Sequence, residues 1–549
     1  MVNGVSKDKL RGGYYTPPEI TEFLAKWAIK GKGDNVLEFS FGNGNFLVSI
    51  VNRLIELKAN KKDIGRKIYG TELIEEEYAT GKNRISEILG AKTDLPNLFQ
   101  GDFFSVYMKL FRHEKFNAIV GNPPFIRYQH FQESHRELAF KIMQEVGLNP
   151  TRLTNAWVPF ILASSLLLNN NGRIALVIPA EILQVKYASE LRQFLSEYFN
   201  AITIISFDKL VFSGIQQEVI LFLGEKSNDI NHGINLVQLE NEKSLKDYIH
   251  CLPDKKDCKP IDHYQDKWTQ YYLTTEEILL LRRLRNDKRF TKLGDIAEID
   301  VGIVTGCNDF FVVNKEERRE YQLDKITKNL VGRTSQIQGI IFNKSDWENN
   351  DTGTLNTHLF TIPKNYNKQL PNRTKKYISL GESLNYHKGY KCSIRSPWYY
   401  VPSVWVSDAF LFRQIYDCPR MVLNKANAVT TDTIHRVKFK DRKKKEKIVG
   451  SFHNSLTFAF AEVMGRSYGG GVLELEPSEA EDLPIPYCDI SDELVDEIDS
   501  LLRENNNMES VLSVVDELIL KKKMNLTSRE ISILRGIWKK LSTKRIGRK

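Results

Sequence analysis

A short loop that combines an amide, two prolines and an aromatic ring is the stretch of this sequence most suited to chemistry. It reads Gly121-Asn122-Pro123-Pro124-Phe125 and follows an apolar, strand-like run. Two prolines after an asparagine can continue neither a strand nor a helix interior, so they fix a rigid, exposed loop at the edge of a sheet. A plain turn is the competing interpretation, but it leaves the asparagine and the phenylalanine unexplained.

The residue types of this loop suit an exocyclic amine on a purine, which is a poor nucleophile because it shares its lone pair with the ring. The side-chain oxygen of Asn122 and a carbonyl of the proline-stiffened backbone can accept the two N–H protons, and Phe125 can stack on the base. This arrangement favours a pyramidal nitrogen aimed at a methyl donor. Rate would come from positioning and electrostatic preorganisation, without a general base. Inside a duplex the base must first be flipped out.

Acidic residues and glycines mark the ends of the strands expected before this loop. The run VLEFSFGNGNFL places Glu38 at the end of one strand and Gly42 in the turn to a helix, where backbone can approach a ligand closely. Glu72 ends the next strand, where a carboxylate can accept hydrogen bonds from both ribose hydroxyls of a nucleoside cofactor. Further on, Asp102 can accept from an adenine amino group and Phe103 can pack beside it. Strand-to-helix punctuation and a surface glutamate are the competing interpretations of the glycines and of Glu72.

Alternating strand-like and helix-like runs must position these residues. The strand-like runs lie at 35–39, 67–72, 116–120, 173–179, 202–207 and 219–223, and the helix-like runs at 45–58, 75–89, 157–169 and 187–199. This alternation is typical of a parallel sheet covered by helices. The first part of the chain is therefore predicted to be a doubly wound α/β domain with a mostly parallel sheet.

A chain of 549 residues exceeds what one core usually supports, so at least two domains are expected. The boundaries are placed at 1–230 for the α/β domain, 231–262 for an Asn-, Asp- and Lys-rich linker, and 263–549 for an α+β domain. That second domain has β-like runs at 302–304 and 310–313. Its last part shows helical patterns at 493–504, 508–523 and 528–541, which suggest a small helical hairpin.

The charge distribution favours a polyanionic partner, although a net charge of +9 alone is weak evidence. The second half carries the run KFKDRKKKEK at 438–447 and a lysine- and arginine-rich C-terminus. The six cysteines lack the paired C-x-x-C spacing of zinc sites, so no metal is expected. No apolar run approaches the roughly 20 residues of a membrane helix, and the N-terminus lacks a secretory signal, so the expected location is the cytoplasm.

The order of these segments resembles the gamma class of amino-methyltransferases, the Taq-type enzymes of bacterial restriction-modification systems. A Tyr15-Thr16-Pro17-Pro18-Glu19 segment precedes the glycine loop; the acidic strand ends, N-P-P-F and G-R-I-A-L-V-I-P-A at 172–180 then follow in family order. The resemblance covers roughly 10–225. It implies that the α/β domain is a Rossmann-like domain that uses S-adenosylmethionine as its methyl donor.

The resemblance also implies roles for individual residues. By resemblance, Thr16, Glu38 and Gly42 would contact the methionine portion of the cofactor, Glu72 its ribose, and Asp102 and Phe103 its adenine. The target base would be contacted by Asn122, Pro123, Pro124 and Phe125. Phe212 falls where the family packs a residue on the opposite face of the flipped base, with ordinary core as the competing interpretation. Phe39 is a departure, because the family usually has proline there.

The region over 263–549 resembles the target-recognition domains of the same class, more loosely, at 301–306, 467–473 and 483–486. Basic residues are candidates for phosphate or base contacts, because neutralising phosphates dominates affinity for duplex DNA. These candidates are Arg333, Arg395, Arg436 and Lys443 to Lys445, each of which could equally be a solvated surface charge.

The predicted function is site-specific transfer of a methyl group to N6 of an adenine in double-stranded DNA. N-P-P-[FY] is typical of adenine enzymes and S-P-P-[YW] of N4-cytosine enzymes, so N4-cytosine methylation is a second hypothesis. A fused restriction-modification enzyme, a non-catalytic DNA-binding protein, and an RNA or protein methyltransferase are further hypotheses that these motifs leave open. A monomer is expected, with a separate cognate restriction endonuclease as a candidate partner.

Overall fold

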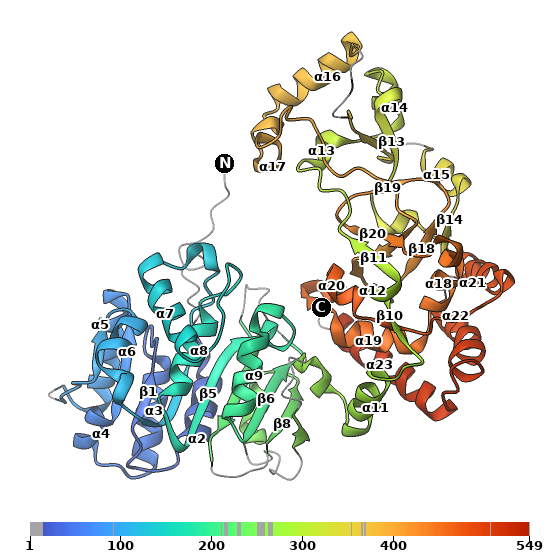
Figure 1. The fold of residues 1–549 in the computed structure, drawn as a ribbon. Coiled ribbons are helices and arrows are strands. Elements are labelled where there is room, and N and C mark those ends of the chain that lie inside the picture. Colours follow the sequence, from blue (N-terminus) through green and yellow to red (C-terminus); the bar gives the residue numbers. More distant parts are fainter. Residues whose placement is uncertain are drawn as a thin grey trace. The chain divides into compact units, whose positions relative to one another are not determined.

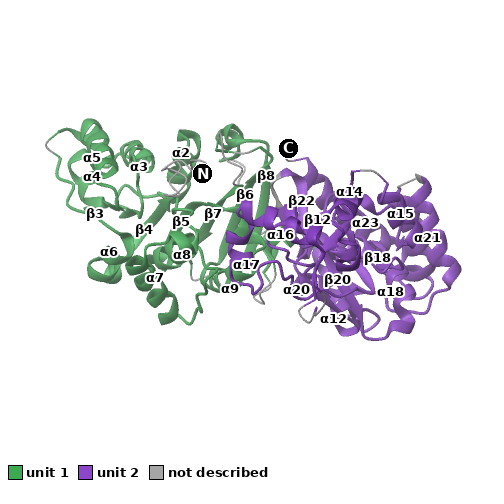
Figure 2. Ribbon diagram, turned by 90° about the horizontal axis from the view of Figure 1, so that it is seen from above, with its two compact units in different colours: residues 1–275, 548 green, residues 276–547, 549 purple. Residues whose placement is uncertain are grey.

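The chain forms two compact units in the computed structural model, which describes residues 15–91, 93–209, 211–212, 218–227, 232–249, 258–261, 267–352, 354–363, 366, 369–505 and 507–547. Unit 1 comprises residues 1–275 with 548, and unit 2 comprises residues 276–547 with 549 (Figure 2). None of the described helices combines the length and apolar character needed to cross a membrane.

A nine-stranded sheet is the centre of unit 1 (Figure 1). Its strands lie in the order β3-β2-β1-β4-β5-β7-β6-β8-β9. Their bounds are β1 (Val36–Glu38), β2 (Ile68–Glu72), β3 (Leu98–Gln100), β4 (Phe116–Gly121), β5 (Leu168–Pro179), β6 (Ala201–Phe207), β7 (Val219–Glu225), β8 (Gly233–Leu239) and β9 (Lys259–Pro260). Strands β1 to β5 pair in parallel, as does β6 with β8. Antiparallel pairs join β7 to β5 and β6, and β9 to β8. The predicted mostly parallel sheet is confirmed.

Helices cover both faces of this sheet (Figure 2). On one face lie α2 (Pro18–Ala28), α3 (Asn45–Glu56), α4 (Lys61–Lys67) and α5 (Glu75–Leu89); on the other lie α6 (Phe103–Lys109), α7 (Glu133–Glu145), α8 (Trp157–Leu166) and α9 (Ser189–Tyr198). α8 is buried along almost its whole length, because nearly every residue in it is apolar. α3 instead buries one apolar stripe against α2 and α5. The α/β prediction for this part of the chain is therefore confirmed.

The segment expected to be a linker contributes to the sheet. Residues 233–239 form β8, which pairs with β6 along its whole length, and 259–260 form β9. Of the rest of 231–262, Glu242–Ser244 form a 3-10 turn and Leu245–Tyr248 form α10, while 231, 250–257 and 262 lie outside the described residues. Four of the seven residues of β8, which reads GINLVQL, are apolar, but the Asn-, Asp- and Lys-rich residues on either side of it favoured the linker prediction. The two units divide between Thr275 and Glu276.

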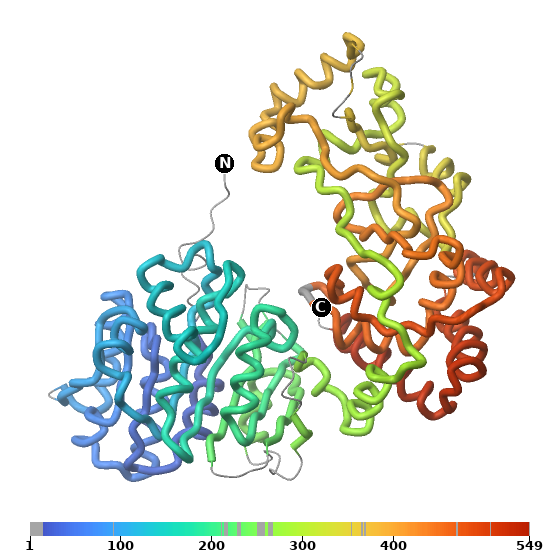
Figure 3. The backbone as a smooth tube through the Cα atoms, in the orientation of Figure 1, coloured from blue at the N-terminus to red at the C-terminus, as the bar shows by residue number. Residues whose placement is uncertain are grey.

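Unit 2 has four small sheets, in keeping with the predicted α+β class. The largest is β11 (Ala297–Asp300), β20 (Ile434–Phe439), β16 (Ala409–Phe412), β18 (Met421–Asn424) and β14 (Ile341–Phe342). The others contain β12 (Val312–Val313), β15 (His358–Phe360), β13 (Thr327–Val331) and β19 (Val429–Thr430); β17 (Gln414–Ile415), β22 (Val472–Glu474) and β21 (Arg466–Tyr468); and β10 (Thr291–Lys292) with β23 (Pro484–Ile485). Because β11 pairs with β20, segments far apart in sequence lie side by side (Figure 3).

The helices of unit 2 surround these sheets. They are α11 (Thr275–Arg285), α12 (Leu293–Ile296), α13 (Asn308–Phe311), α14 (Lys315–Glu320), α15 (Lys344–Asn350), α16 (Asn372–Ser383), α17 (Tyr390–Ser393), α18 (Lys445–Phe452), α19 (Ser455–Met464), α20 (Pro477–Glu481), α21 (Asp492–Asn505), α22 (Met508–Val515) and α23 (Ser528–Ile546). The three predicted C-terminal helical patterns are confirmed; a π-helical turn over Asp516–Lys521 continues α22. α23 packs along α19, so these helices belong to the unit's core rather than to a separate hairpin.

The two β-like runs predicted near the start of unit 2 are wrong in part. Residues 302–304 contain only an isolated bridge from Ile303 to Thr431. Of 310–313, only Val312 and Val313 are strand, because 308–311 form α13. Phe310 and Phe311 are both buried, with their rings 5.0 Å apart, and a helical turn buries two consecutive side chains where an alternating strand would expose one.

Candidate active site

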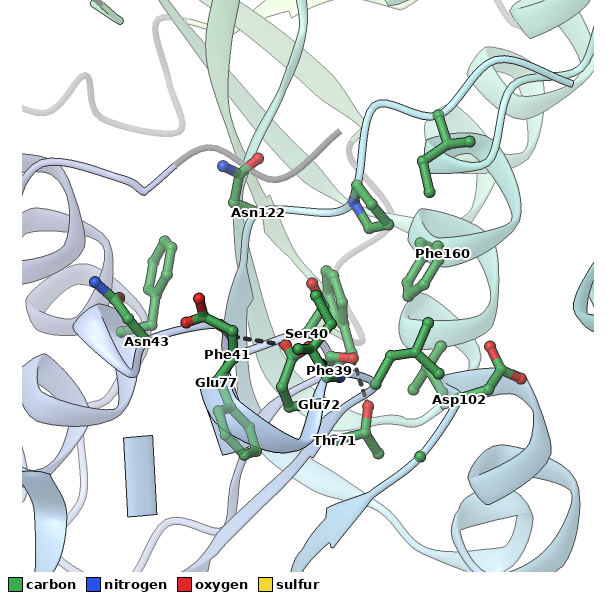
Figure 4. Close-up of a pocket in the computed structure, with 18 of the residues that line it drawn as sticks. Phe39, Ser40, Phe41, Asn43, Thr71, Glu72, Glu77, Asp102, Asn122 and Phe160 are labelled. Atoms are coloured by element: carbon green, nitrogen blue, oxygen red, sulfur yellow. Dashed lines mark hydrogen bonds between the residues drawn. The ribbon is translucent and has the colours of Figure 1, made fainter. Parts of the chain in front are cut away.

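A cavity of about 430 Å³ lies in unit 1, next to the ends of its central strands (Figure 4). β1, β2, β3 and β4 pair in parallel, so Glu38, Glu72, Gln100 and Gly121 end at the same edge of the sheet. The loops that leave this edge contribute much of the lining. This is the position at which open α/β sheets bind ligands.

The structure gathers seven of the predicted site residues around this cavity: Thr16, Gly42, Glu72, Asp102, Phe103, Asn122 and Pro124. In Figure 4, Asn122 lies on one side, and Glu72 and Asp102 on the other. The other four predicted residues, Glu38, Pro123, Phe125 and Phe212, are not among the described lining residues. The cavity therefore brings the expected cofactor residues and the expected catalytic amide to one place.

The glycine turn is held tightly against its surroundings. Gly42 and Gly44 have φ values of 51° and 87°, which L side chains rarely adopt. A Cβ on Gly44 would lie 2.8 Å from Cα of Gly81, so the turn also allows α3 to approach α5. The amide of Gly42 donates to Oε2 of Glu72 at 2.8 Å.

Glu72 thus anchors the glycine turn as well as lining the cavity. Its Oε1 accepts from the amide of Ile74 at 2.9 Å. Burial raises the pKa of Glu72, while the amides of Ile74 and Gly42 oppose that rise. Backbone amides of Ile74, Gly42 and Leu73 act on this carboxylate, so at least one of its roughly four acceptor positions remains. The residue can therefore support the loop and still accept a ligand hydroxyl.

Asp102 and Phe103 form another wall of the cavity. Oδ1 of Asp102 caps α6 by accepting from the amide of Ser105 at 2.9 Å, and Oδ2 lies 3.5 Å from Nδ1 of His135. The ring of Phe103 stacks on Phe160 with centroids 5.3 Å apart. The cap on α6 has a sequence signal, an Asp before an apolar run, whereas the stacking partner has none.

Phe39, where the resembled family has proline, is fully buried and lines the cavity. Its ring lies 5.6 Å from those of Phe103 and Phe160. The departure therefore adds an aromatic ring to the wall, and Glu38 keeps its place at the end of β1.

Glu38 is a fully buried acid at the base of the N-P-P-F loop. Its Oε1 accepts from the amide of Ser40 at 3.3 Å, and Oε2 has no hydrogen-bond partner among the residues described. A Cβ on Gly121 would lie 2.9 Å from Oε1, so a glycine is needed where β4 passes this carboxylate. Burial raises the pKa of Glu38 well above its usual range, and the nearby carboxylate of Glu72 adds to the rise.

The loop after β4 places the amide of Asn122 at the cavity. Its Nδ2 donates to Oγ1 of Thr16 at 3.2 Å. Pro123 is buried, and Phe125 packs against the apolar core of unit 1 that contains Phe212. Both rings therefore lie at the core, and neither belongs to the described lining of the cavity. Leu210 and Ser213, which flank the predicted Phe212 segment, are outside the described residues.

Several lining residues were assigned no role from the sequence. The hydroxyl of Tyr15 donates to Oε1 of Glu77 at 2.5 Å, joining the first described segment to α5. The stretch from His130 to His135 contributes further lining from the loop before α7 and its first turn. These residues are contributed by tertiary packing, which a single sequence does not reveal.

The electrostatic character of the cavity differs from that of the whole chain. Its lining includes the carboxylates of Glu72, Glu77 and Asp102. Within the described part of the chain, no lysine or arginine lines it, although the chain has a net charge of +9. An acidic, aromatic cavity attracts a cationic ligand with apolar surface and disfavours a phosphate.

In unit 2, the predicted basic contacts separate into buried and exposed groups. Arg436 is buried, pairs with Asp300 at 2.6 Å and lies over the ring of Trp405. Arg395 donates to the backbone carbonyls of Val304 and Thr305. Both arginines therefore hold the fold. The exposed members of the predicted set are Arg333, Lys443 and Lys444.

Two known families match this chain, one over its N-terminal part and one over its C-terminal part. Residues 3–302 match the family described as N-6 DNA Methylase, and residues 265–520 match Type II methyltransferase M.Eco57I, C-terminal domain. The type II methyltransferase M.AccI of Acinetobacter calcoaceticus is 23% identical over 542 residues, which cover 93% of each chain. M.HindII of Haemophilus influenzae is 25% identical over 334 residues, or 58% of each chain.

A solved structure with a similar fold is that of the type IIL restriction-modification enzyme MmeI in complex with DNA. The TM-score is 0.59 at 13% identity, and the match covers 96% of this chain and 75% of the other. At this identity the likeness concerns the fold, and it extends over nearly the whole chain.

Proposed function

The chain belongs to the N-6 DNA methylase family, and from this premise we propose that the cavity of unit 1 holds S-adenosylmethionine while the Asn122 loop presents an adenine N6 to it. The chain is an adenine-specific DNA methyltransferase of restriction-modification systems.

The observation that carries the choice of donor is the charge of the cavity. S-adenosylmethionine is a nucleoside with a sulfonium and an ammonium group and no phosphate, which suits a lining with three carboxylates and no described lysine or arginine. In dinucleotide-binding folds, the amides of the glycine turn bind a phosphate. Here the amide of Gly42 already donates to Glu72.

The cofactor's parts fit the lining in the order of the strands. We assign the ribose to Glu72, the adenine amino group to Asp102, and the adenine ring to the aromatic wall that includes Phe103. The methionine portion falls to Thr16, Glu38 and Gly42; the buried Oε2 of Glu38 is an acceptor for which a cationic group is a suitable partner.

We assign the target base to the N-P-P-F loop. Oδ1 of Asn122 and the backbone carbonyl of Pro123 would accept hydrogen bonds from the two N–H groups of N6, which directs the nitrogen's lone pair at the methyl group. When bound, the donor would supply an activated methyl: the N–C bond would form as the C–S bond breaks, S-adenosylhomocysteine would leave, and the methylated nitrogen would release one proton to water. Pro124 keeps the loop rigid, and Phe212, in the apolar core, and Phe125, which packs against that core, would flank the flipped base.

We assign sequence recognition on duplex DNA to unit 2. The match of residues 265–520 to the C-terminal domain of a type II methyltransferase supports this role, as do the exposed Lys443 and Lys444. A single flipped adenine requires one copy of the chain, so we propose a monomer that acts beside a separate cognate restriction endonuclease. N4-cytosine methylation and a fused or silent enzyme are not favoured.

The substitution Asn122→Ala tests the assignment. We expect transfer to unmethylated DNA to fall by about 100- to 1,000-fold, the usual cost of removing one preorganised polar contact in a transition state. The Kd values for S-adenosylmethionine and DNA should stay close to those of the wild type. Asn43→Ala, on the glycine side of the same cavity, is the matched control and should alter cofactor affinity more than turnover. Wild-type turnover by Asn122→Ala would refute the role of this loop.

A further inference from the structure

We propose that Thr16, Asn45 and Arg84 are positioning residues that orient the amide of Asn122, through a chain of hydrogen bonds that runs along the cofactor cavity. This inference rests on the proposed function. It adds Asn45 and Arg84, which no motif indicates, and it gives Thr16 a second role beyond contact with the cofactor. We call the hydrogen-bonded series of Arg84, Asn45, Thr16 and Asn122 the relay.

The relay joins four separate segments of unit 1. Nη1 of Arg84, in α5, donates to Oδ1 of Asn45 at 2.8 Å. Nδ2 of Asn45, the first residue of α3, donates to the backbone carbonyl of Thr16 at 2.9 Å. Nδ2 of Asn122, after β4, donates to Oγ1 of Thr16 at 3.2 Å. Each donor and acceptor in the series is of the type its neighbour needs.

The orientation of the Asn122 amide decides whether it can act on an amine. A primary amide carries an acceptor oxygen and a donor NH2 group at its two ends, and rotation by 180° exchanges them. Only the oxygen can accept a hydrogen bond from an N–H group of N6. Because Oγ1 of Thr16 accepts from Nδ2 of Asn122, Oδ1 is directed to the other side of the group. In the structure, Thr16 therefore holds the amide in the productive orientation.

Thr16 is itself held in place. It is buried, with 3% exposure, so water competes poorly for its contacts. Pro17 and Pro18 follow it and begin α2, which restricts the backbone. The hydroxyls of Thr21 in α2 and Ser49 in α3 lie 2.8 Å apart and tie the two helices together. A rigid Thr16 can therefore define the position of Asn122.

Arg84 acts from outside the cavity. Its Nη1 also donates to the carbonyl of Asn43 at 2.8 Å, so it holds both sides of the glycine turn. Thr16, Asn43, Asn45 and Asn122 line the cavity, and Arg84 does not. A bound cofactor would contact the middle of the relay, whereas Arg84 can influence transfer only through its partners. Occupancy of the cavity and the orientation of Asn122 are thereby coupled.

Paired substitutions on the full-length enzyme test the relay. Thr16→Val keeps the shape but removes the hydroxyl, and Thr16→Ser keeps the hydroxyl. With unmethylated genomic DNA, we expect kcat to fall about tenfold in Thr16→Val and to remain within about twofold of wild type in Thr16→Ser, the range expected for one hydrogen bond. Arg84→Met should lower kcat about fivefold with little change in the Kd for DNA, and Arg84→Lys should recover part of the loss.

A double-mutant cycle separates the relay from independent contacts. If Arg84 acts through Thr16, Arg84→Met should cost little more in the Thr16→Val background, whereas independent roles would make the losses in log kcat add. Arg53→Met is the matched control: Arg53 lies on α3, pairs with Glu56 and donates to the carbonyl of Ile29. It should leave kcat unchanged.

Wild-type kcat in Arg84→Met, equal losses in Thr16→Val and Thr16→Ser, or additive losses in the cycle would each overturn the relay. Binding of S-adenosylmethionine by each variant, measured by calorimetry, verifies the fold of the cavity. If Thr16→Val fails to bind, the Arg84 pair still decides the outcome. An inactive wild-type enzyme would instead refute the proposed function itself, so the two failures are distinguishable.

Discussion

The buried carboxylates of the two units have different partners. In unit 1, Glu38 and Glu72 are buried at strand ends, and no lysine or arginine of the described residues forms an ion pair with either; backbone amides are their neighbours. In unit 2, the buried Glu462 pairs with Arg545 at 2.7 Å and the buried Asp516 with Arg535 at 2.7 Å.

The difference separates sites for a ligand from sites that hold the fold. A buried carboxylate without a cation costs stability, and a cationic ligand would offset that cost. Where a buried carboxylate pairs with an arginine, the arginine already offsets this cost, so removing the arginine would destabilise the fold. The carboxylates of unit 1 are therefore available for a ligand, while those of unit 2 hold α19 and the C-terminal helical segments together.

The largest expected effect is in unit 2, at Arg545. Arg545→Met would leave Glu462 buried without its partner, and we expect the free energy of unfolding of unit 2 to fall by about 3–5 kcal/mol. Hydrogen exchange of peptides from α19 and α23 under increasing urea measures this loss, with peptides from α8 as the control from unit 1. Arg545→Met with Glu462→Leu should recover much of the stability. Unchanged exchange in Arg545→Met would remove the distinction between the units.

A smaller effect is expected in unit 1, at Glu38. Burial raises the pKa of Glu38 well above its usual range, so the folded protein without cofactor binds this proton more tightly than the unfolded chain does. The free energy of unfolding should therefore fall as the pH rises above the ordinary carboxyl pKa of about 4.3. A cationic cofactor favours the ionised form, so its affinity should rise over the same range.

Glu38→Gln should remove both of these dependences on pH. At pH 7 we expect the variant to melt at a higher temperature without cofactor and to bind S-adenosylmethionine about tenfold more weakly, a loss typical of one charged contact. Calorimetry and thermal melts between pH 5 and 7 measure the two effects. Wild-type affinity in Glu38→Gln throughout that range would mean that this carboxylate does not serve the ligand.

The same contrast explains what the sequence could predict. At the strand ends of unit 1, each functional residue lies within a short motif, so Glu72, Asp102 and Asn122 could be placed at one sheet edge from strand order alone. The relay partner Arg84 and the wall residue Phe160 come from helices, and their contacts with the motifs arise only in the folded chain.

Some strands could not be predicted because they pair with segments far away in the sequence. In unit 2, β13 at 327–331 pairs with β19 at 429–430, and each strand alone is too short to show a periodic pattern. β8 of unit 1 was missed although four of its seven residues are apolar, because the residues on either side of it are rich in Asn, Asp and Lys. Arg436 shows that residue type alone does not reveal burial. It was predicted to contact DNA, but the fold buries it against Asp300.

The most direct measurement is to incubate the purified protein with S-adenosylmethionine labelled in its methyl group and with unmethylated genomic DNA, then to digest the DNA and identify the labelled nucleoside. The account predicts label in N6-methyl-2′-deoxyadenosine. Label in N4-methyl-2′-deoxycytidine would contradict the choice of base, and no label in DNA would contradict the assignment of the cavity and the Asn122 loop.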